Sequence, residues 1–381
     1  MDHKEAKRFE KCRVKEDDII LVRSGVNTGD CARVTREFNN AYAAYDLILE
    51  LKNSVTSKYL NVFLNLDIGR AQIHRVKARS AQPHLNADEV KSFKIPLSPL
   101  PIQEKVANLI DKSLRDEERK KDKAESLLNS IEPYILDELG IKIPEIEEKS
   151  PKVFSVTASV LKDGRLDPFY YEPKYESIDE ALRIGRYKLI EFGKIISEIS
   201  GGATPKAKGI AYLEDDGIPF LRVQNITEED INLEDVKYIN EETHNNLLKR
   251  SKLQPKDLIF TITGRIGTVA VVPEDFGEGN INQHSVRIHL IEGVSERYVA
   301  CVFNSTLGKA LSLRGVSGGT RIALDYEAIK SIIIPLPPYS VQERIAEEIH
   351  KRREEAKRLK GEAEEILERS KMQIEKLILG T

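Results

Sequence analysis

Two stretches of the sequence, IPLSPLPIQEKVANLI at residues 95–110 and IPLPPYSVQERIAEEI at residues 334–349, decide the architecture of this chain because they are near copies of one another. Their identities all share one offset: Ile95/Ile334, Pro96/Pro335, Leu97/Leu336, Pro99/Pro338, Gln103/Gln342, Glu104/Glu343 and Ala107/Ala346. Agreement over so many ungapped positions is not expected by chance. It indicates an internal duplication.

The duplication continues upstream of these stretches. At the same offset, EDDIIL (16–21) matches PKDLIF (255–260), and LNADEVKSFKIPL (85–97) matches LDYEAIKSIIIPL (324–336). With a one-residue gap, SGVNTGDCARV (24–34) also matches TGRIGTVAVV (263–272). We therefore predict a tandem repeat in which each copy ends in a long helix.

The two helices follow from local rules. In each copy a Pro-rich turn ends a β-type run, and a Gln-Glu pair places negative charge in the first helical turn. In the second copy, apolar side chains recur at spacings near three and four: Ile345, Ile349, Ala356, Leu359, Ala363, Ile366 and Leu377. Arg352, Ser370 and Gln373 interrupt this seam, which predicts an imperfect coiled coil.

The first helix is expected to run to about Leu139 and has a fully charged middle, RDEERKKDK (115–123), typical of a solvated face. The two helices can pair with each other as an antiparallel coiled coil. The alternative is that each packs on its own domain.

Between the helices, short β-rich runs alternate with Gly, Asn and Pro turns: IPFLRV, DLIFTI, GTVAVV, SVRIHLI and SIIIPL. Their irregular order argues against a doubly wound parallel sheet, so the predicted class is α+β. The composition of the 381 residues, 40% hydrophobic and 32% charged with a net charge of −3, fits a soluble globular protein. Binding to nucleic acid then requires positive charge gathered on one face.

The N-terminal sequence, the apolar stretches and the cysteines indicate where in the cell the protein is expected. The N-terminus is charged and no stretch is long and apolar enough for a membrane helix. Cys12, Cys31 and Cys301 are far apart and odd in number, which suggests neither disulfides nor a metal knuckle. We expect a cytoplasmic protein without membrane contact.

The ordered motifs SGGATP (200–205), IPFLRVQNI (218–226), GRIGTVAVV (264–272), NINQHSVRI (280–288) and SGGTRIALD (317–325), with the helix that follows, resemble a target-recognition domain of type I restriction specificity subunits (HsdS). This resemblance covers essentially the whole chain. It implies that each recognition domain reads one half of a bipartite site in double-stranded DNA, with the helix pair setting the gap. It also implies partners: two DNA-adenine methyltransferase subunits and a motor–nuclease subunit.

The expected domains follow from the repeat and the resemblance. They are a partial first target-recognition domain (1–98), a first spacer helix (99–140), a linker (141–151), a second target-recognition domain (152–337) and a second spacer helix (338–381). Met1 aligns near Asn240 of the second copy, so the first domain lacks counterparts of roughly residues 165–239. Independent DNA reading by residues 1–94 is therefore not expected.

Candidate DNA contacts lie in Gly-flanked loops, where backbone can approach phosphate and side chains carry paired donors and acceptors. They are Gly201, Gly202, Thr204, Lys206, Lys208, Arg222, Gln224, Asn225, Arg265, Asn282, Gln283, His284, Gly319, Thr320 and Arg321. In the first copy, Arg23 and Gln82 align near Ile262 and Arg321. The alternative for each loop is a tight turn between strands with incidental polar residues. Gln224 and Asn225 can instead simply end a strand, and His284 can instead have a structural role.

No catalytic signature accompanies these loops. GRIGT is not followed by the Lys-Ser or Lys-Thr of a phosphate-binding loop, and no methyltransferase motif or metal-ligand spacing of His and Cys is present. We expect a non-catalytic subunit without cofactor or metal. Two alternatives stay open: the C-terminal part of a single-chain restriction–modification enzyme, and a truncated scaffold that binds methyltransferase subunits without reading DNA.

Overall fold

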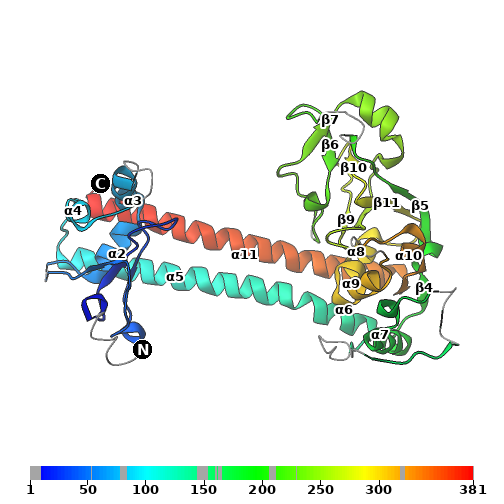
Figure 1. Cartoon of the computed structure of the whole chain (residues 1–381), viewed down its shortest axis with the longest axis horizontal. Coiled ribbons are helices and arrows are strands. Elements are labelled where there is room, and N and C mark those ends of the chain that lie inside the picture. Colours follow the sequence, from blue (N-terminus) through cyan, green and yellow to red (C-terminus); the bar gives the residue numbers. More distant parts are fainter. Residues whose placement is uncertain are drawn as a thin grey trace. The chain divides into compact units, whose positions relative to one another are not determined.

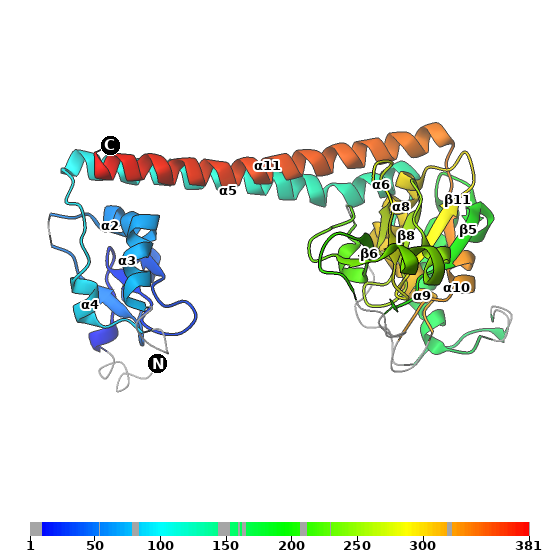
Figure 2. The same cartoon turned by 90° about the horizontal axis from the view of Figure 1, so that it is seen from above.

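The structure, a computed structural model, describes residues 10–52, 54–77, 84–143, 153–158, 161, 165–205, 212–228, 230–317 and 322–380. The chain divides into two compact units. The first unit comprises Met1–Glu125 with Lys357–Thr381, and the second unit comprises Ser126–Ala356. Both contain separate helical and β-sheet regions, which makes the fold α+β (Figures 1 and 2).

The first unit is built on a small antiparallel sheet of order β2-β1-β3, with β1 (Ile19–Leu21), β2 (Cys31–Arg33) and β3 (Leu47–Leu49). Three helices follow: α2 (Ser57–Asn65), α3 (Asp67–Lys77) and α4 (Ala87–Lys91). Tyr59 and Phe63 of α2 pack in one cluster with Val106, Ile374 and Ile378 of the long helices. Short 3₁₀ turns occupy Glu10–Cys12 and Arg36–Phe38.

The second unit contains three sheets. The largest is antiparallel, of order β5-β11-β8-β9, with β5 (Ile196–Gly201), β11 (Ser285–Leu290), β8 (Leu258–Thr261) and β9 (Val269–Val271). The second has order β10-β6-β7, with β10 (Asn280–Ile281), β6 (Ile218–Leu221) and β7 (Lys237–Ile239). The third pairs β12 (Ile333–Pro335) with β4 (Leu189–Glu191). The five strands predicted from the sequence are confirmed as β6, β8, β9, β11 and β12.

Short helices cover these sheets: α7 (Pro173–Ile184), α8 (Glu296–Asn304), α9 (Thr306–Arg314) and α10 (Tyr326–Ser331). Helix α8 packs on β9, and α7 packs on α9. Phe260 of β8 and Phe303 of α8 meet edge to face with ring centroids 5.0 Å apart in the main core. Single helical turns lie at Pro168–Tyr171, Phe192–Ile195, Val223–Asn225, Thr243–Leu247 and Lys249–Ser251.

Two long helices begin at the Pro-rich turns and contain the Gln-Glu pairs: α5 (Leu100–Asn129) and α11 (Tyr339–Leu379). In the first unit, the Ser113 and Ser370 hydroxyls lie 2.5 Å apart, and Lys120 pairs with Glu362 at 2.5 Å. The number on α11 falls as the number on α5 rises, so the helices run in opposite directions there. Ser370, a polar interruption of the seam, is thus buried against another hydroxyl.

A third helix, α6 (Ile131–Leu139), continues from α5 in the second unit. The helical segment ends at Leu139, as predicted, but it is interrupted at Ser130. Pro133 supplies the reason: it has no N–H to donate to the carbonyl of Asn129, and its ring crowds that carbonyl. Arg352 of α11 donates at 2.8 Å to the Ser130 carbonyl, which also accepts from the Tyr134 amide, so a second interruption of the seam also finds a polar partner.

Equivalent contacts support the two Pro-rich turns. The hydroxyl of Tyr59 donates to the Pro96 carbonyl at 2.7 Å, and that of Tyr298 donates to the Pro335 carbonyl at 2.8 Å. The two tyrosines share the offset of the repeat. A buried glutamine also braces each helix start by bonding to backbone groups: Gln103 in the first unit and Gln342 in the second.

Candidate nucleic-acid interface

Two of the predicted loops leave neighbouring parallel strands at the same edge. Strands β6 and β10 pair in parallel, with Phe220 opposite Asn280 and Leu221 opposite Ile281. The carboxyl ends of parallel neighbours meet at one edge of a sheet. The loop after β6 (222–226) and the loop after β10 (282–284) are therefore adjacent, and the amide of Asn282 donates to the Leu221 carbonyl at 3.0 Å.

The turn after β8 (262–267) joins the loop after β6 through Arg265. The exposed guanidinium donates to the carbonyls of Val223 at 3.1 Å and Gln224 at 3.4 Å. Gly264 and Gly267 have φ of 71° and 83°, a left-handed conformation that favours glycine, and they turn the chain so that Arg265 reaches across. Arg265 thereby fixes the backbone from which the Gln224 side chain projects.

The same turn joins the loop after β10 through His284. Its Nδ1 lies 2.7 Å from the Thr263 hydroxyl, and its Nε2 lies 2.9 Å from Nε2 of Gln283. The amide of Ile262 also donates to the His284 carbonyl at 2.9 Å. Three loops from separate parts of the sequence are thus bonded into one platform, defined here as residues 222–226, 262–267 and 282–284.

The glycines at the end of β5 lie against this platform. A side chain at Gly202 would overlap the carbonyl oxygens of Ile281 and Asn282, and one at Gly201 would overlap the Tyr326 hydroxyl. Glycine is required here for close approach of two backbones. Thr204 follows in the same segment and is half-buried.

The platform residues differ in what they offer to a ligand. Gln224, Arg265 and Gln283 have exposed side chains, and His284 is half-buried. Asn225 is only 1% exposed, and its amide donates to the carbonyls of Asn232 and Glu234 while its oxygen accepts from the Arg222 amide.

Two further predicted residues also face inward. Asn282 is buried and its side-chain oxygen accepts from the His284 amide at 3.0 Å. The Arg222 guanidinium donates to the Asp235 carbonyl at 2.6 Å. In this structure Arg222, Asn225 and Asn282 shape the loops, which is the structural alternative for those positions.

Other predicted positions lie outside the described residues: Lys206, Lys208, Gly319, Thr320, Arg321 and, in the first copy, Gln82. Arg23 is described, and its Nε donates to Nε2 of His84 at 3.2 Å. The sequence reasoning missed Thr263. Thr263 directly precedes the Gly-Arg-Ile-Gly turn, and this position was the sequence feature that could have identified it.

A buried charged group supports the far end of β8. Asp257, fully buried, lies 2.9 Å from Nδ1 of His289 and 3.5 Å from the guanidinium of Arg287. Burial raises the pKa of Asp257, and it lowers that of Arg287. Asp257 precedes β8 whereas the platform turn follows it, so this network holds the sheet and does not contribute to the platform.

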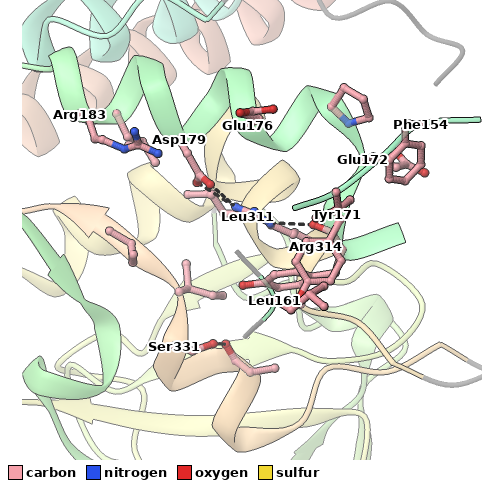
Figure 3. A pocket seen from close by; sticks show the side chains of 18 of the residues that line it. Phe154, Leu161, Tyr171, Glu172, Glu176, Asp179, Arg183, Leu311, Arg314 and Ser331 are labelled. Carbon is pink, nitrogen blue, oxygen red and sulfur yellow. Dashed lines mark hydrogen bonds and ion pairs between the residues drawn. The ribbon is translucent and has the colours of Figure 1, made fainter. Parts of the chain in front are cut away.

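A cavity of about 610 Å³ in the second unit contains none of the predicted residues (Figure 3). It is lined by residues of α7, α9 and the 153–158 segment. Arg314, one of two arginines in its lining, already binds both carboxylate oxygens of Asp179 at 2.8 and 2.9 Å and the Tyr170 carbonyl at 3.1 Å. The Arg314 guanidinium is therefore already paired within the protein, and we do not assign this cavity to the DNA interface.

Among the residues that the structure describes, no group of three or more His, Cys, Asp or Glu side chains is arranged to hold a metal ion. Within the same residues, no helix has the length and apolar character to cross a bilayer.

The sequence matches the family model for the type I restriction modification DNA specificity domain over residues 2–129 and 187–368, most of the chain. The chain belongs to this family.

It is 22% identical over 280 residues to the specificity subunit of the type I restriction enzyme EcoBI of Escherichia coli, covering 70% of this chain and 52% of that protein. It is 22% identical over 354 residues to the EcoKI specificity subunit of Escherichia coli strain K12, covering 88% and 67%. The chain thus spans about half to two thirds of the length of these relatives.

Solved structures show the fold of this family member. One is a chain from a structural study of how the type I R-M system assembles its complex and changes conformation. Its TM-score is 0.60, with 14% identity, over 96% of this chain and 82% of that chain. Another is the S subunit of a type I restriction-modification system from M. genitalium, with TM-score 0.50 and 12% identity over 97% and 84%.

Proposed function

We propose that this chain is a DNA-recognition subunit of a type I restriction–modification complex and that the platform of the second unit reads DNA sequence. The observation that carries the proposal is the exposure of Gln224, Arg265 and Gln283 on three loops that are hydrogen-bonded to one another. Arg pairs with guanine and Gln with adenine in the major groove. Membership of the specificity family supports the same role.

Phosphate contacts are proposed for the other Gly-flanked segments. Gly201, Gly202, Thr204, Lys206, Lys208, Gly319, Thr320 and Arg321 remain predicted contacts on the sequence pattern. Phosphate contacts fix the register of a protein on the duplex, whereas base contacts carry the specificity. The first unit is not proposed to read DNA independently.

The two long helices are proposed to form an antiparallel coiled coil that spaces the tandem domains 1–98 and 152–337. The linker 141–151 joins helix 99–140 to the second domain, and helix 338–381 follows that domain. Polar pairs within each unit, Ser113 with Ser370 and Arg352 with Ser130, support such pairing because polar residues in a seam specify register.

The partners follow from the family. Two DNA-adenine methyltransferase subunits would dock on the helices and carry the methylation, and a motor–nuclease subunit would join for cleavage. This chain would supply specificity and no catalysis.

Methylome sequencing of cells that express the chain with the methyltransferase encoded beside it tests the proposal. A bipartite motif with a constant gap, or one defined half-site, is the expected result. Methyltransferase binding without any motif would refute DNA reading and favour the scaffold alternative. A reading frame that continues upstream into nuclease and methylase domains would favour the other alternative, the C-terminal part of a single-chain enzyme.

A further inference from the structure

The platform contains one side chain whose hydrogen-bonding pattern is set by its neighbours. Gln283 is exposed, and its Nε2 lies 2.9 Å from Nε2 of His284. An amide nitrogen can only donate, so the imidazole nitrogen must accept. The other imidazole nitrogen then carries the hydrogen and donates to the Thr263 hydroxyl at 2.7 Å. With the Gln283 amide in this orientation, Nε2 of His284 is the acceptor and Nδ1 is the donor.

This chain of hydrogen bonds leaves a defined pair of groups on Gln283. One N–H is used by His284, which leaves the second N–H and the carbonyl oxygen of the same amide. Among the described residues, no partner contacts that oxygen. A planar amide that presents one donor and one acceptor side by side matches adenine, whose major-groove edge offers the N7 acceptor and the N6 donor. Guanine offers two acceptors there and does not match.

The surrounding structure holds His284 in place. Its backbone amide donates to the Asn282 side chain at 3.0 Å, and its carbonyl accepts from Ile262 at 2.9 Å. Asn282 is itself buried and bonded to Leu221. The backbone of His284 is thus held from both sides, and its imidazole lies between the Thr263 hydroxyl and the Gln283 amide.

We propose that Gln283 reads one adenine of the recognised half-site, and that Thr263 and His284 are positioning residues that select adenine by fixing the orientation of the Gln283 amide. This inference rests on the proposed function and adds to it the base, the reading residue and the two residues that set its selectivity. Gln224 is also exposed, but within the described parts of the chain no contact orients its amide, so we assign it no such selectivity.

The test begins with the full chain and a randomised pool of DNA duplexes, from which the retained sequences define a half-site. At each adenine of that half-site, two analogues are substituted: 7-deazaadenine, which lacks N7, and purine, which lacks the 6-amino group. At one position both analogues should weaken binding, and Gln283→Ala should weaken binding of the unmodified duplex by about 5- to 150-fold. In that variant the analogues at the same position should have no further effect.

Matched variants separate positioning from general structure. Thr263→Val keeps the shape and removes the hydroxyl, whereas Thr263→Ser keeps the hydroxyl. The valine variant and His284→Phe should lose preference for adenine at that one position and keep their preferences elsewhere, and the serine variant should retain it. Gln254→Ala, an exposed glutamine before β8, is the control and should bind as the wild type does.

The outcomes are distinguishable. A uniform loss on all duplexes in Gln283→Ala, or unchanged base preferences with specific wild-type binding, would overturn this inference and leave the proposed function standing. Failure of the wild-type chain to select any sequence would overturn both. If Gln283→Ala unfolds, as judged by its thermal transition, Gln283→Glu replaces it, because it keeps the shape and removes the donor needed for N7.

Discussion

The buried glutamine at the start of α11 offers a sharp test of how the second unit is held together. Gln342 is 2% exposed; its oxygen accepts from the Ser295 amide at 2.9 Å, and its nitrogen donates to the Pro337 carbonyl at 2.8 Å. In Gln342→Leu the volume is nearly kept but both backbone groups lose their partner. Each unpaired buried group costs about 1–3 kcal/mol, so for the two groups we expect the free energy of unfolding to fall by about 2–6 kcal/mol.

Urea titration followed by circular dichroism measures this loss, and each transition is analysed separately because the chain has two units. Hydrogen exchange of the Ser295 amide should be slow in the wild type and faster in the variant. Gln103→Leu provides an internal comparison: Gln103 bonds three backbone groups, of Ser54, Thr56 and Ser98, so its loss should destabilise the first unit more.

Gln373→Leu on the exposed face of α11 is the matched control and should change stability by less than about 0.5 kcal/mol. The reasoning would be refuted by a Gln342→Leu protein as stable as the wild type with the Ser295 amide still protected. That result would mean that water or a rearranged turn satisfies the two backbone groups.

Three further perturbations address the platform and the helix contacts. Arg265→Ala should weaken sequence-specific DNA binding by about 1–3 kcal/mol because the loop carrying Gln224 loses its clamp, and equal loss on random DNA in a filter-binding assay would contradict this. Gly202→Ala should destabilise the second unit by about 1–3 kcal/mol in thermal unfolding, since the new methyl group overlaps backbone carbonyls; an unshifted transition would show that the strand can move. Arg344 lowers the pKa of Glu138, so their pair stabilises the fold above the ordinary carboxyl pKa and is lost as pH falls through the lowered pKa. Glu138→Gln should reduce the acid dependence of the urea midpoint, and identical pH profiles would reject that contribution.

Much of the fold could be predicted because its signals are local or repeated. The five β-runs and the two helix starts follow from residue type and from Pro, Gly and Asn turns. The break at Ser130 was also encoded locally, by Pro133, but the regular apolar spacing on both sides of it concealed the effect. The repeat adds information that periodicity lacks, because the shared offset places Gln103 and Gln342 at equivalent positions of the two copies.

The candidate interface was predicted less completely. Composition and Gly-flanked motifs selected loops that the structure joins by hydrogen bonds, but they gave equal weight to Asn225 and Gln224. The structure buries Asn225 and exposes Gln224, because the amide of Asn225 is used by backbone carbonyls of residues 232 and 234.

The sequence by itself determined the duplication, the α+β class and the two long helices, since each depends on neighbours along the chain or on comparison of the chain with itself. Only the tertiary structure decided which polar side chains face outward and which amide is oriented. Those properties depend on contacts between distant segments, such as Arg265 with Val223 and Thr263 with His284. A hydrogen bond between separate loops leaves no periodic signal in the sequence, so it becomes visible only when the strands that carry the loops are paired.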